Sequence, residues 1–359
     1  MKPRVLFAIM TALALALSGG SSIAATSTKA KCAHASKAKS SQCKSAPTAQ
    51  ASRKHAGKRK AGQPVRMAKV RHAFSGKLAV AKRKAARARA ADEPITLRLD
   101  ENGQPRLSSS SFYISNQNTG EVLLQRNARH VIPIASITKL MTAIVVLESG
   151  SDLNEILTIS GDDIDYLKGT HSRLVLGTQL ARKEMLHLAL MSSENRAASA
   201  LARHYPGGRM AFLDAMNAKA RLIGMSDTRF YDSTGLTPRN VSSARDLSRL
   251  VVAASNYPLI REYSTTSERY FYINGHSKRF GNTNGLVKSP DWIISVSKTG
   301  YISEAGRCLV MQAWMQDQPL VIVLMNANGH MRTVDAQRVR LWLEERPERL
   351  AATHREQQG

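Results

Sequence analysis

The sequence predicts an α+β fold, in which an antiparallel sheet is flanked by helices and one part of the domain is mostly helical. Short runs rich in β-branched and apolar residues occur near both ends of the folded part, at 112–115 and 122–125 and again at 293–297, 308–315 and 320–326. Amphipathic and apolar runs of helical length lie between them. We therefore expect one sheet that is closed by strands from both ends of the domain.

The individual elements follow in chain order. The first two strands flank a hairpin turn signal, Asn118-Thr119-Gly120. An extended segment containing Pro133 then leads into an apolar run, which predicts a helix over 137–147. Further helices are expected at 180–191, 209–222 and 244–254, and a final helix is expected at about 334–345.

The formal net charge of +25 belongs to one segment of the chain. Residues 26–91 contain 19 Lys and Arg and no Asp or Glu, and Lys2 and Arg4 add two more charges, which leaves +4 for residues 92–359. A segment of Ala, Lys, Arg and Ser with almost no aromatic residues cannot bury enough apolar surface to offset its ordering entropy. We expect a disordered basic segment over 26–106, a folded domain over 107–345 and a short tail over 346–359.

Residues 1–25 have the order of a secretory signal peptide. Lys2 and Arg4 precede an uncharged run at 5–17, and small residues follow it. The run is shorter than the roughly 20 residues that span a bilayer, although a retained N-terminal anchor is the alternative interpretation. Ser18 and its neighbours provide no Cys for lipidation. We expect a periplasmic protein without a transmembrane helix in the mature chain.

Export narrows the partners that the basic segment could bind. Nucleic acid is the first expectation for such a composition, but it is a poor one for an exported protein. Anionic envelope polymers are one expectation, and a plain solvated linker is the other. Cys32 and Cys43 could form a disulfide in an oxidising compartment, whereas Cys308 lies in an apolar run and is expected to be a core residue. The cysteine spacing predicts no metal site.

Three short motifs occur in order along the folded part: Ser136-Ile137-Thr138-Lys139, Ser193-Glu194-Asn195 and Lys298-Thr299-Gly300. The first pattern is weak by itself, since S-x-x-K also occurs at 36–39, 41–44 and 295–298. Context selects Ser136, because it lies where an extended segment becomes a helix and helical spacing places Lys139 on the same face. Helix capping is the structural alternative for Ser136 and for the second motif.

These residue types fit nucleophilic catalysis. A serine hydroxyl needs a base to take its proton, and Lys139 can be that base only if burial or a neighbouring cation such as Lys298 lowers its pKa. The start of a helix offers Ser136 free backbone N–H groups for an oxyanion. Ser193 could relay a proton, and Asn195 could hold a substrate amide or Lys139. A cation and a hydroxyl at 298–299 suit a carboxylate.

The ordered trio resembles the signature of the low-molecular-mass penicillin-binding proteins, the serine D-alanyl-D-alanine peptidases, over about 107–345. The stretches 232–236, 243–247 and 282–284 are similar to further blocks of that family. The resemblance implies a β-lactamase/transpeptidase-like fold and a peptidase that acts on peptidoglycan stem peptides and is acylated by β-lactams. It implies no metal or organic cofactor.

The resemblance also implies roles for individual residues. Ser136 would be the acyl-enzyme nucleophile and Lys139 its base, with Ser193 and Asn195 as the second catalytic element. Substrate would bind to Lys298, Thr299, Gly300 and Tyr301 on an edge strand, and the backbone N–H groups of Ser136 and Tyr301 would form the oxyanion hole.

Within the family, the stretch 298–307 resembles the D-alanyl-D-alanine endopeptidase (penicillin-binding protein 7-like) branch, which cuts peptide crosslinks. Tyr301 stands where many carboxypeptidases carry His or Thr, and Glu194 occupies the variable middle of its motif. The short stretch after the last helix leads us to expect neither the additional β-domain nor the amphipathic anchor of the membrane-bound carboxypeptidases.

Three alternatives remain open. A D-alanyl-D-alanine carboxypeptidase shares all the motifs. A class A β-lactamase is the nearest rival enzyme, but the E-x-x-L-N stretch that supplies its deacylating base is absent from the sequence. A non-enzymatic wall-binding protein is the rival from another class, and the basic segment is the feature that favours it.

Overall fold

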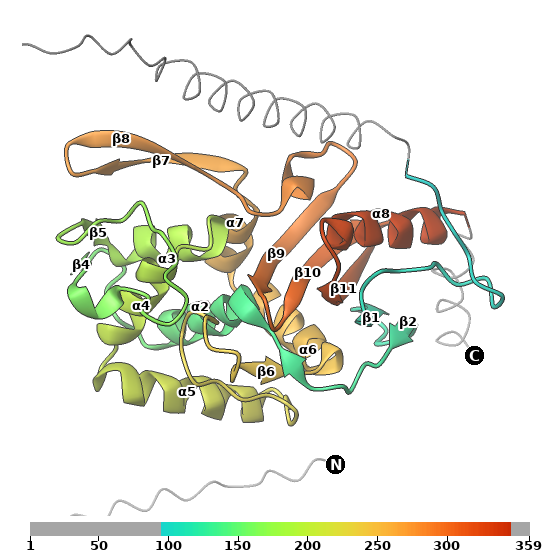
Figure 1. Ribbon diagram of the computed structural model, residues 1–359, viewed down its shortest axis with the longest axis horizontal. Helices are drawn as coiled ribbons and strands as arrows, with labels where there is room; N and C mark the ends of the chain where they lie inside the picture. The colour runs from blue at the N-terminus through green and yellow to red at the C-terminus, as the bar shows by residue number, and fades with distance from the viewer. Residues whose placement is uncertain (1–94, 346–359) are drawn as a thin grey trace, which may run out of the picture. The chain divides into compact units, whose positions relative to one another are not determined.

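A five-stranded antiparallel sheet forms the centre of the computed structural model, which describes residues 95–345. The strand order is β2-β1-β11-β10-β9 (Figure 1). The strands are β1 (Ser111–Asn116), β2 (Val122–Arg126), β9 (Ile293–Ile302), β10 (Gly306–Met315) and β11 (Gln318–Ala327). Strands from both ends of the domain therefore pair in one sheet, which confirms the predicted α+β class.

Both faces of this sheet are buried. Along β10, Leu309 and Met311 belong to one hydrophobic cluster, whereas Cys308 and Val310 belong to the other. The first cluster includes apolar side chains of the last helix, α8 (Met331–Glu344), and the second joins the sheet to the remaining helices. Because side chains alternate along a strand, a strand covered on both faces reads as a nearly continuous apolar run. This explains why 308–315 and 320–326 were predictable.

Six helices lie between the strands in sequence. They are α2 (Thr138–Glu148), α3 (Arg182–Met191), α4 (Asn195–Arg203), α5 (Gly208–Leu222), α6 (Ala244–Ser255) and α7 (Pro258–Thr265). Helix α2 contacts each of the other five, and every residue from 138 to 146 is buried. A helix that is buried on all sides lies inside a core, so the first turn of α2, including its polar residues Thr138 and Lys139, is shielded from water.

Short elements connect these parts. Among them are three 3₁₀ turns: η1 (Ala135–Ile137), η2 (Gly161–Asp163) and η3 (Gly285–Lys288). Three small antiparallel sheets have two strands each. They pair β3 (Ile132–Pro133) with β6 (Val241–Ser242), β4 (Ile156–Thr158) with β5 (Gln179–Ala181), and β7 (Glu268–Ile273) with β8 (His276–Gly281). Figure 1 shows the β7–β8 hairpin at the upper left, and its side chains Phe271, Ile273 and Phe280 are buried in the cluster that includes the helices.

Several elements differ from the sequence predictions. The helix expected at 180–191 begins at Arg182, because residues 179–181 form β5. The strand expected at 293–297 continues to Ile302 and so contains the third motif. The β7–β8 hairpin was not predicted, although Asn274-Gly275 is a strong two-residue turn signal and both residues have positive φ.

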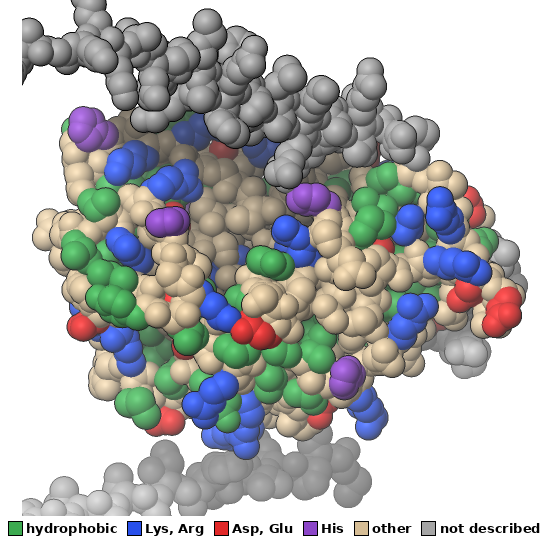
Figure 2. Space-filling view, in the orientation of Figure 1, with side chains coloured by type: hydrophobic (Ala, Val, Ile, Leu, Met, Phe, Trp, Pro, Cys, Tyr) green, Lys and Arg blue, Asp and Glu red, His purple; other side chains and the backbone are tan. Residues whose placement is uncertain are grey.

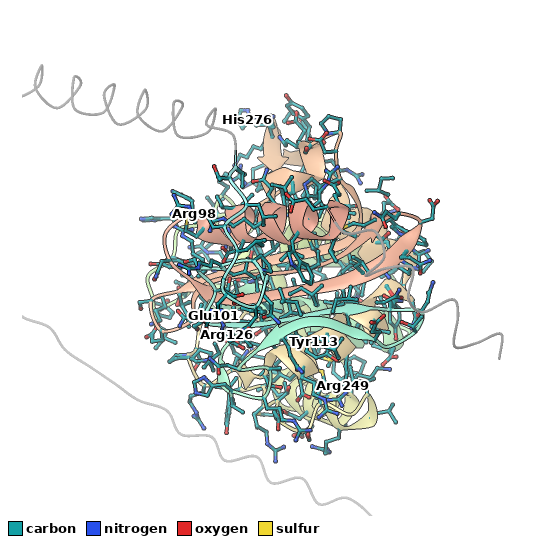
Figure 3. The ribbon with its side chains drawn as sticks, turned by 90° about the vertical axis from the view of Figure 1, so that its right-hand side faces the viewer. Arg98, Glu101, Tyr113, Arg126, Arg249 and His276 are labelled. Atoms are coloured by element: carbon teal, nitrogen blue, oxygen red, sulfur yellow. The ribbon has the colours of Figure 1, made fainter. Side chains whose placement is uncertain are left out.

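The folded part also begins earlier than expected. Residues 95–106 were assigned to the basic segment, yet they contact the domain: the Trp342 indole donates to the Gly103 carbonyl at 2.8 Å. Glu101 lies beside Arg126 of β2, and both line one pocket (Figure 3). The predicted signal peptide, the Lys/Arg-rich stretch and the Cys32–Cys43 pair lie outside the described residues.

The described surface agrees with the small net charge of the domain. Figure 2 shows Lys and Arg side chains interspersed with Asp and Glu on the visible face. None of the helices within 95–345 is both long enough and apolar enough to cross a bilayer.

A buried carboxylate joins α8 to the segment before β1. Asp335 is fully buried and accepts hydrogen bonds from the backbone N–H groups of Ser108 and Ser109, at 2.9 and 2.8 Å, and from the Ser109 hydroxyl at 2.7 Å. We expect Asp335→Ala to lower the free energy of unfolding by about 3 kcal/mol, since it leaves buried donors unpaired. Urea denaturation measures this.

The matched control is Glu344→Ala, in the same helix. Glu344 forms an exposed i,i+4 ion pair with Arg340, and loss of such a pair changes stability by about 1 kcal/mol or less. Equal urea midpoints for Asp335→Ala and the unaltered protein would contradict the assigned role.

Candidate active site

The first motif lies where β3 ends and η1 leads into α2. Ser136 is the middle residue of η1 and is half-buried, and Lys139 follows in the first turn of α2 and is fully buried. Lys139 Nζ donates to Ser136 Oγ at 2.8 Å. Ser136 is not the capping residue of either helix, and no side-chain cap hydrogen bond is present at η1 or α2. The helix-cap alternative for Ser136 is therefore wrong.

Lys139 has three hydrogen-bond acceptors. Besides Ser136, its Nζ donates to Asn195 Oδ1 at 2.8 Å and to the Thr234 carbonyl at 2.7 Å. Burial lowers the pKa of Lys139 from 10.5 to about 7, although the charges of Asp232 and Glu194 act in the opposite direction. An amine with this pKa is partly neutral near pH 7 and can accept a proton.

The second motif spans the turn between α3 and α4. Ser193 has a φ of +60°, which is unusual for a residue with a side chain, and Asn195 is the first residue of α4. Glu194 occupies the cap position of α4 without a side-chain cap hydrogen bond, so the helix-cap alternative is wrong here too. Ser193 Oγ instead accepts a hydrogen bond from Lys298 Nζ at 2.9 Å.

The third motif lies on the edge strand β9. Lys298 is buried, and its Nζ donates to Ser193 Oγ and to the Thr299 carbonyl, both at 2.9 Å. Burial lowers the pKa of Lys298 well below its usual value, and the positive charges of Lys139 and Arg332 lower it further. Thr299 Oγ1 donates to Thr283 Oγ1 at 2.7 Å. Lys139 is therefore close enough to affect the protonation of Lys298.

Two glycines allow the backbone around Ser136 to be tightly enclosed. A Cβ on Gly300 would lie 2.8 Å from the Ile134 carbonyl oxygen and 3.2 Å from the Ser136 nitrogen. A Cβ on Gly235, whose φ is +82°, would lie 1.9 Å from the Ala135 carbonyl oxygen. Strand β9 and the 232–236 loop can approach the nucleophile turn this closely only without side chains.

These residues line one cleft of about 510 Å³. Its other walls come from the 164–173 loop, from the end of β9 and from α8; the lining residues are Ser136, Lys168, Thr170, Ser193, Asn195, Leu236, Thr283, Thr299, Gly300, Tyr301, Ile302, Ser303 and Arg332. Six of the eight predicted site residues line this cleft, namely Ser136, Ser193, Asn195, Thr299, Gly300 and Tyr301. Lys139 and Lys298 do not line it, but their amines donate to the cleft serines Ser136 and Ser193.

Several residues in or next to the cleft were given no role from the sequence. Thr234 acts through its backbone carbonyl, so its side chain carries no signal. Arg332 donates to the carbonyls of Gly300 and Cys308, at 3.0 and 3.2 Å, and places a cation beside Lys298. Thr283 belongs to a stretch that resembled a family block, and this was the signal that could have identified it.

Cys308 is fully buried, as was expected for a core residue, and burial raises the pKa of its thiol to about 11.

A serine hydrogen-bonded to a buried lysine, facing an S-x-N turn and a K-T-G edge strand, defines a serine acyl-transfer enzyme of the penicillin-binding type. The chain belongs to peptidase family S11, D-alanyl-D-alanine carboxypeptidase, whose model matches residues 99–329. It is thus a hydrolase of the serine D-Ala-D-Ala peptidase class.

Similar sequences and solved structures support this assignment. The chain is 49% identical to the D-alanyl-D-alanine endopeptidase of Pseudomonas aeruginosa and 46% identical to that of Escherichia coli, each over 244 residues that cover 67% of this chain and 79% of the relative. Among solved structures, the Streptomyces K15 DD-transpeptidase matches with a TM-score of 0.62 and 26% identity, over 67% of this chain and 98% of that one. The expected transpeptidase-like fold is confirmed.

We expect Gly235→Ala to slow the acylation of Ser136 by a fluorescent penicillin at least about tenfold, because the new Cβ displaces the turn that holds the nucleophile. The control is Gly224→Ala, which imposes the same kind of positive-φ strain at +76° but meets no atom nearer than 3.7 Å. Similar losses in both variants would mean that strain, and not close approach to Ala135, limits acylation.

The pKa of Lys139 predicts a pH dependence. Below pH 7 a growing fraction of Lys139 carries a proton and cannot act as a base, so the rate constant for penicillin labelling rises with pH through about 7 and falls about tenfold per pH unit below it. Labelling time courses at each pH measure this, and the final amount of label at exhaustion serves as the control. A rate independent of pH between about 5 and 8 would exclude Lys139 as the titrating base.

Proposed function

We propose that this protein is a D-alanyl-D-alanine endopeptidase, which cuts D-Ala crosslinks between peptidoglycan stem peptides through an acyl-enzyme on Ser136. The observation that carries the proposal is the pair of hydrogen bonds Lys139–Ser136 and Lys298–Ser193, at 2.8 and 2.9 Å, whose serines both line one cleft. The first pair supplies a nucleophile with its base, and the second supplies a proton path for the leaving group.

Acylation begins with neutral Lys139. Its amine accepts the hydroxyl proton of Ser136 while Oγ attacks the carbonyl carbon of the D-alanyl residue. The carbonyl oxygen becomes an oxyanion, which the backbone N–H groups of Ser136 and Tyr301 stabilise. The close approach of Gly300 to the Ser136 nitrogen supports this assignment, because it brings the end of β9 against the nucleophile turn.

The intermediate then expels the amine of the second peptide. The leaving nitrogen takes the Ser193 hydroxyl proton, and Ser193 regains a proton from Lys298 through their hydrogen bond. Lys298 and the Thr299 hydroxyl also suit a carboxylate next to the leaving amine. Before deacylation, the Lys139 ammonium loses its proton to solvent and Lys298 regains one from solvent, so Lys139 is again a base. Water then gives a proton to neutral Lys139 while its oxygen attacks the ester carbonyl carbon. The bond to Ser136 Oγ breaks, Lys139 returns the proton to Oγ, and the D-alanyl carboxylic acid leaves and ionises.

The choice of an endopeptidase rests on the 298–307 stretch and on the names of the two relatives that are nearly half identical. Tyr301 follows the third motif at the rim of the cleft, and its side chain is 58% exposed, so it can contact substrate beyond the scissile bond. A carboxypeptidase is the second candidate, and the description of the matching family favours it.

We further propose that residues 1–25 direct export to the periplasm, and that the Lys/Arg-rich segment associates with anionic envelope polymers. Peptidoglycan is an extracytoplasmic substrate, so export is consistent with the proposed reaction. The 19 cations without a counter-charge in 26–91 support binding to polyanions.

Ser136→Ala should abolish covalent labelling by fluorescent penicillin, because no other side chain can replace the attacking oxygen. Labelling is read on a denaturing gel. The control is Ser110→Ala. Ser110 is not among the residues that line the cleft, and its hydroxyl accepts a hydrogen bond from Asn326 Nδ2 at 3.0 Å, so this variant should be labelled normally. Label retained on Ser136→Ala would place the nucleophile elsewhere, and an unlabelled native protein would refute acyl-enzyme chemistry.

Digestion of purified sacculi separates the two peptidase candidates. An endopeptidase should deplete dimeric muropeptides and release the corresponding monomers, because it hydrolyses the bond between two stems. Chromatography of the muropeptides measures this, with Ser136→Ala as the inactive control. If monomers lose only their terminal D-Ala while dimers persist, the protein is a carboxypeptidase.

A further inference from the structure

The acceptors around Lys139 decide where its lone pair points when it is neutral. A neutral amine has two N–H bonds and one lone pair. The Thr234 carbonyl and Asn195 Oδ1 can only accept hydrogen bonds, whereas the Ser136 hydroxyl can also donate. The two N–H bonds therefore go to the two carbonyl oxygens, and the lone pair faces the Ser136 proton. This holds only while the oxygen, and not the NH₂ group, of the Asn195 amide faces Lys139.

A hydrogen-bonded chain behind Asn195 fixes this orientation. Asn195 Nδ2 donates to Thr170 Oγ1 at 3.0 Å, and Thr170 Oγ1 donates to Asp165 Oδ2 at 2.7 Å. Although partial burial acts to raise it, hydrogen bonds from the backbone N–H groups of Lys168 and Thr170 keep the pKa of Asp165 below its ordinary value. An ionised carboxylate can only accept, so the Thr170 proton is committed to Asp165 and the Thr170 oxygen is left to accept from the Asn195 NH₂ group.

We propose that Thr170 is a positioning residue for acyl transfer: backed by Asp165, it orients the Asn195 amide and so points the lone pair of Lys139 at Ser136. This inference rests on the proposed acyl-enzyme function. Thr170 acts through Asn195 and makes no hydrogen bond to Ser136 or Lys139 among the described contacts of 95–345.

The loop that carries Thr170 is attached on several sides. Ser172 Oγ donates to Glu194 Oε2 at 2.7 Å, and Lys168 Nζ pairs with Glu304 Oε1 at 2.5 Å, which links the loop to the turn between β9 and β10. These contacts hold the loop against the second motif independently of the Thr170–Asn195 hydrogen bond. The orientation of Asn195 can therefore be altered without releasing the loop.

Thr170→Val tests the inference, because valine has the shape of threonine but can neither donate nor accept. Loss of the chain lets the Asn195 amide turn, so that its NH₂ group competes with Ser136 for the lone pair. We expect the plateau rate of penicillin acylation to fall at least about tenfold. The rising limb of the pH profile should also move to lower pH, because the Lys139 ammonium loses an acceptor.

Two further variants separate positioning from general damage. Thr170→Ser retains the hydroxyl, so its acylation rate and the pH at which that rate rises should equal those of the unaltered protein. Ser172→Ala removes another hydrogen bond of the same loop but keeps the hydrogen bonds from Asn195 to Thr170 and from Thr170 to Asp165. It should therefore leave the pH at which the acylation rate rises unchanged. An unaltered profile in Thr170→Val, a failure of Thr170→Ser to restore it, or the same shift in Ser172→Ala would each overturn the inference. An unlabelled native protein would instead refute the proposed function.

Discussion

The site depends on the burial of two lysine amines within one small volume. Lys139 and Lys298 are both almost inaccessible to solvent, and among residues 95–345 each amine contacts hydroxyl and carbonyl oxygens and no carboxylate. Burial disfavours the charged form of an amine, and for Lys298 the nearby cations Lys139 and Arg332 disfavour it further. Burial alone lowers the pKa of Lys139 to about 7, so a large fraction of this amine is neutral at physiological pH, as a base for a serine hydroxyl requires.

The architecture supplies the dry surroundings that these amines need. Helix α2 is buried along most of its length, so its first turn lies within the core that joins the helices to the sheet. Strand β9 is the edge of the sheet, but α7 packs against it. Lys298 is buried even though it belongs to an edge strand, and Ser193 of the second motif contacts its amine. Neither lysine could be desolvated by its own element alone.

Local backbone strain contributes to the geometry of the site. Ala135 and Ser193 have φ values of +49° and +60°, which are unfavourable for residues with a side chain by about 1 kcal/mol or more. Ala135 directly precedes the nucleophile Ser136, and Ser193 is part of the proposed proton path. Gly235 and Gly300 allow the surrounding loop and strand to approach the Ala135–Ser136 backbone closely. Packing on both sides keeps Ser136 in a turn that its sequence would not adopt by itself.

The sequence by itself determined the parts that depend on local pattern. The strands at 308–315 and 320–326 and most helices were predictable because the pattern of apolar residues along consecutive positions indicates which side chains are buried. Helical spacing likewise placed Ser136 beside Lys139. Only the tertiary structure decided which residues serve them from a distance. Thr170 and Arg332 come from a loop and from α8, and Thr234 contributes a carbonyl that every residue has. The 232–236 stretch resembled a family block, but the roles of these residues follow from packing between distant segments, which a local pattern does not specify.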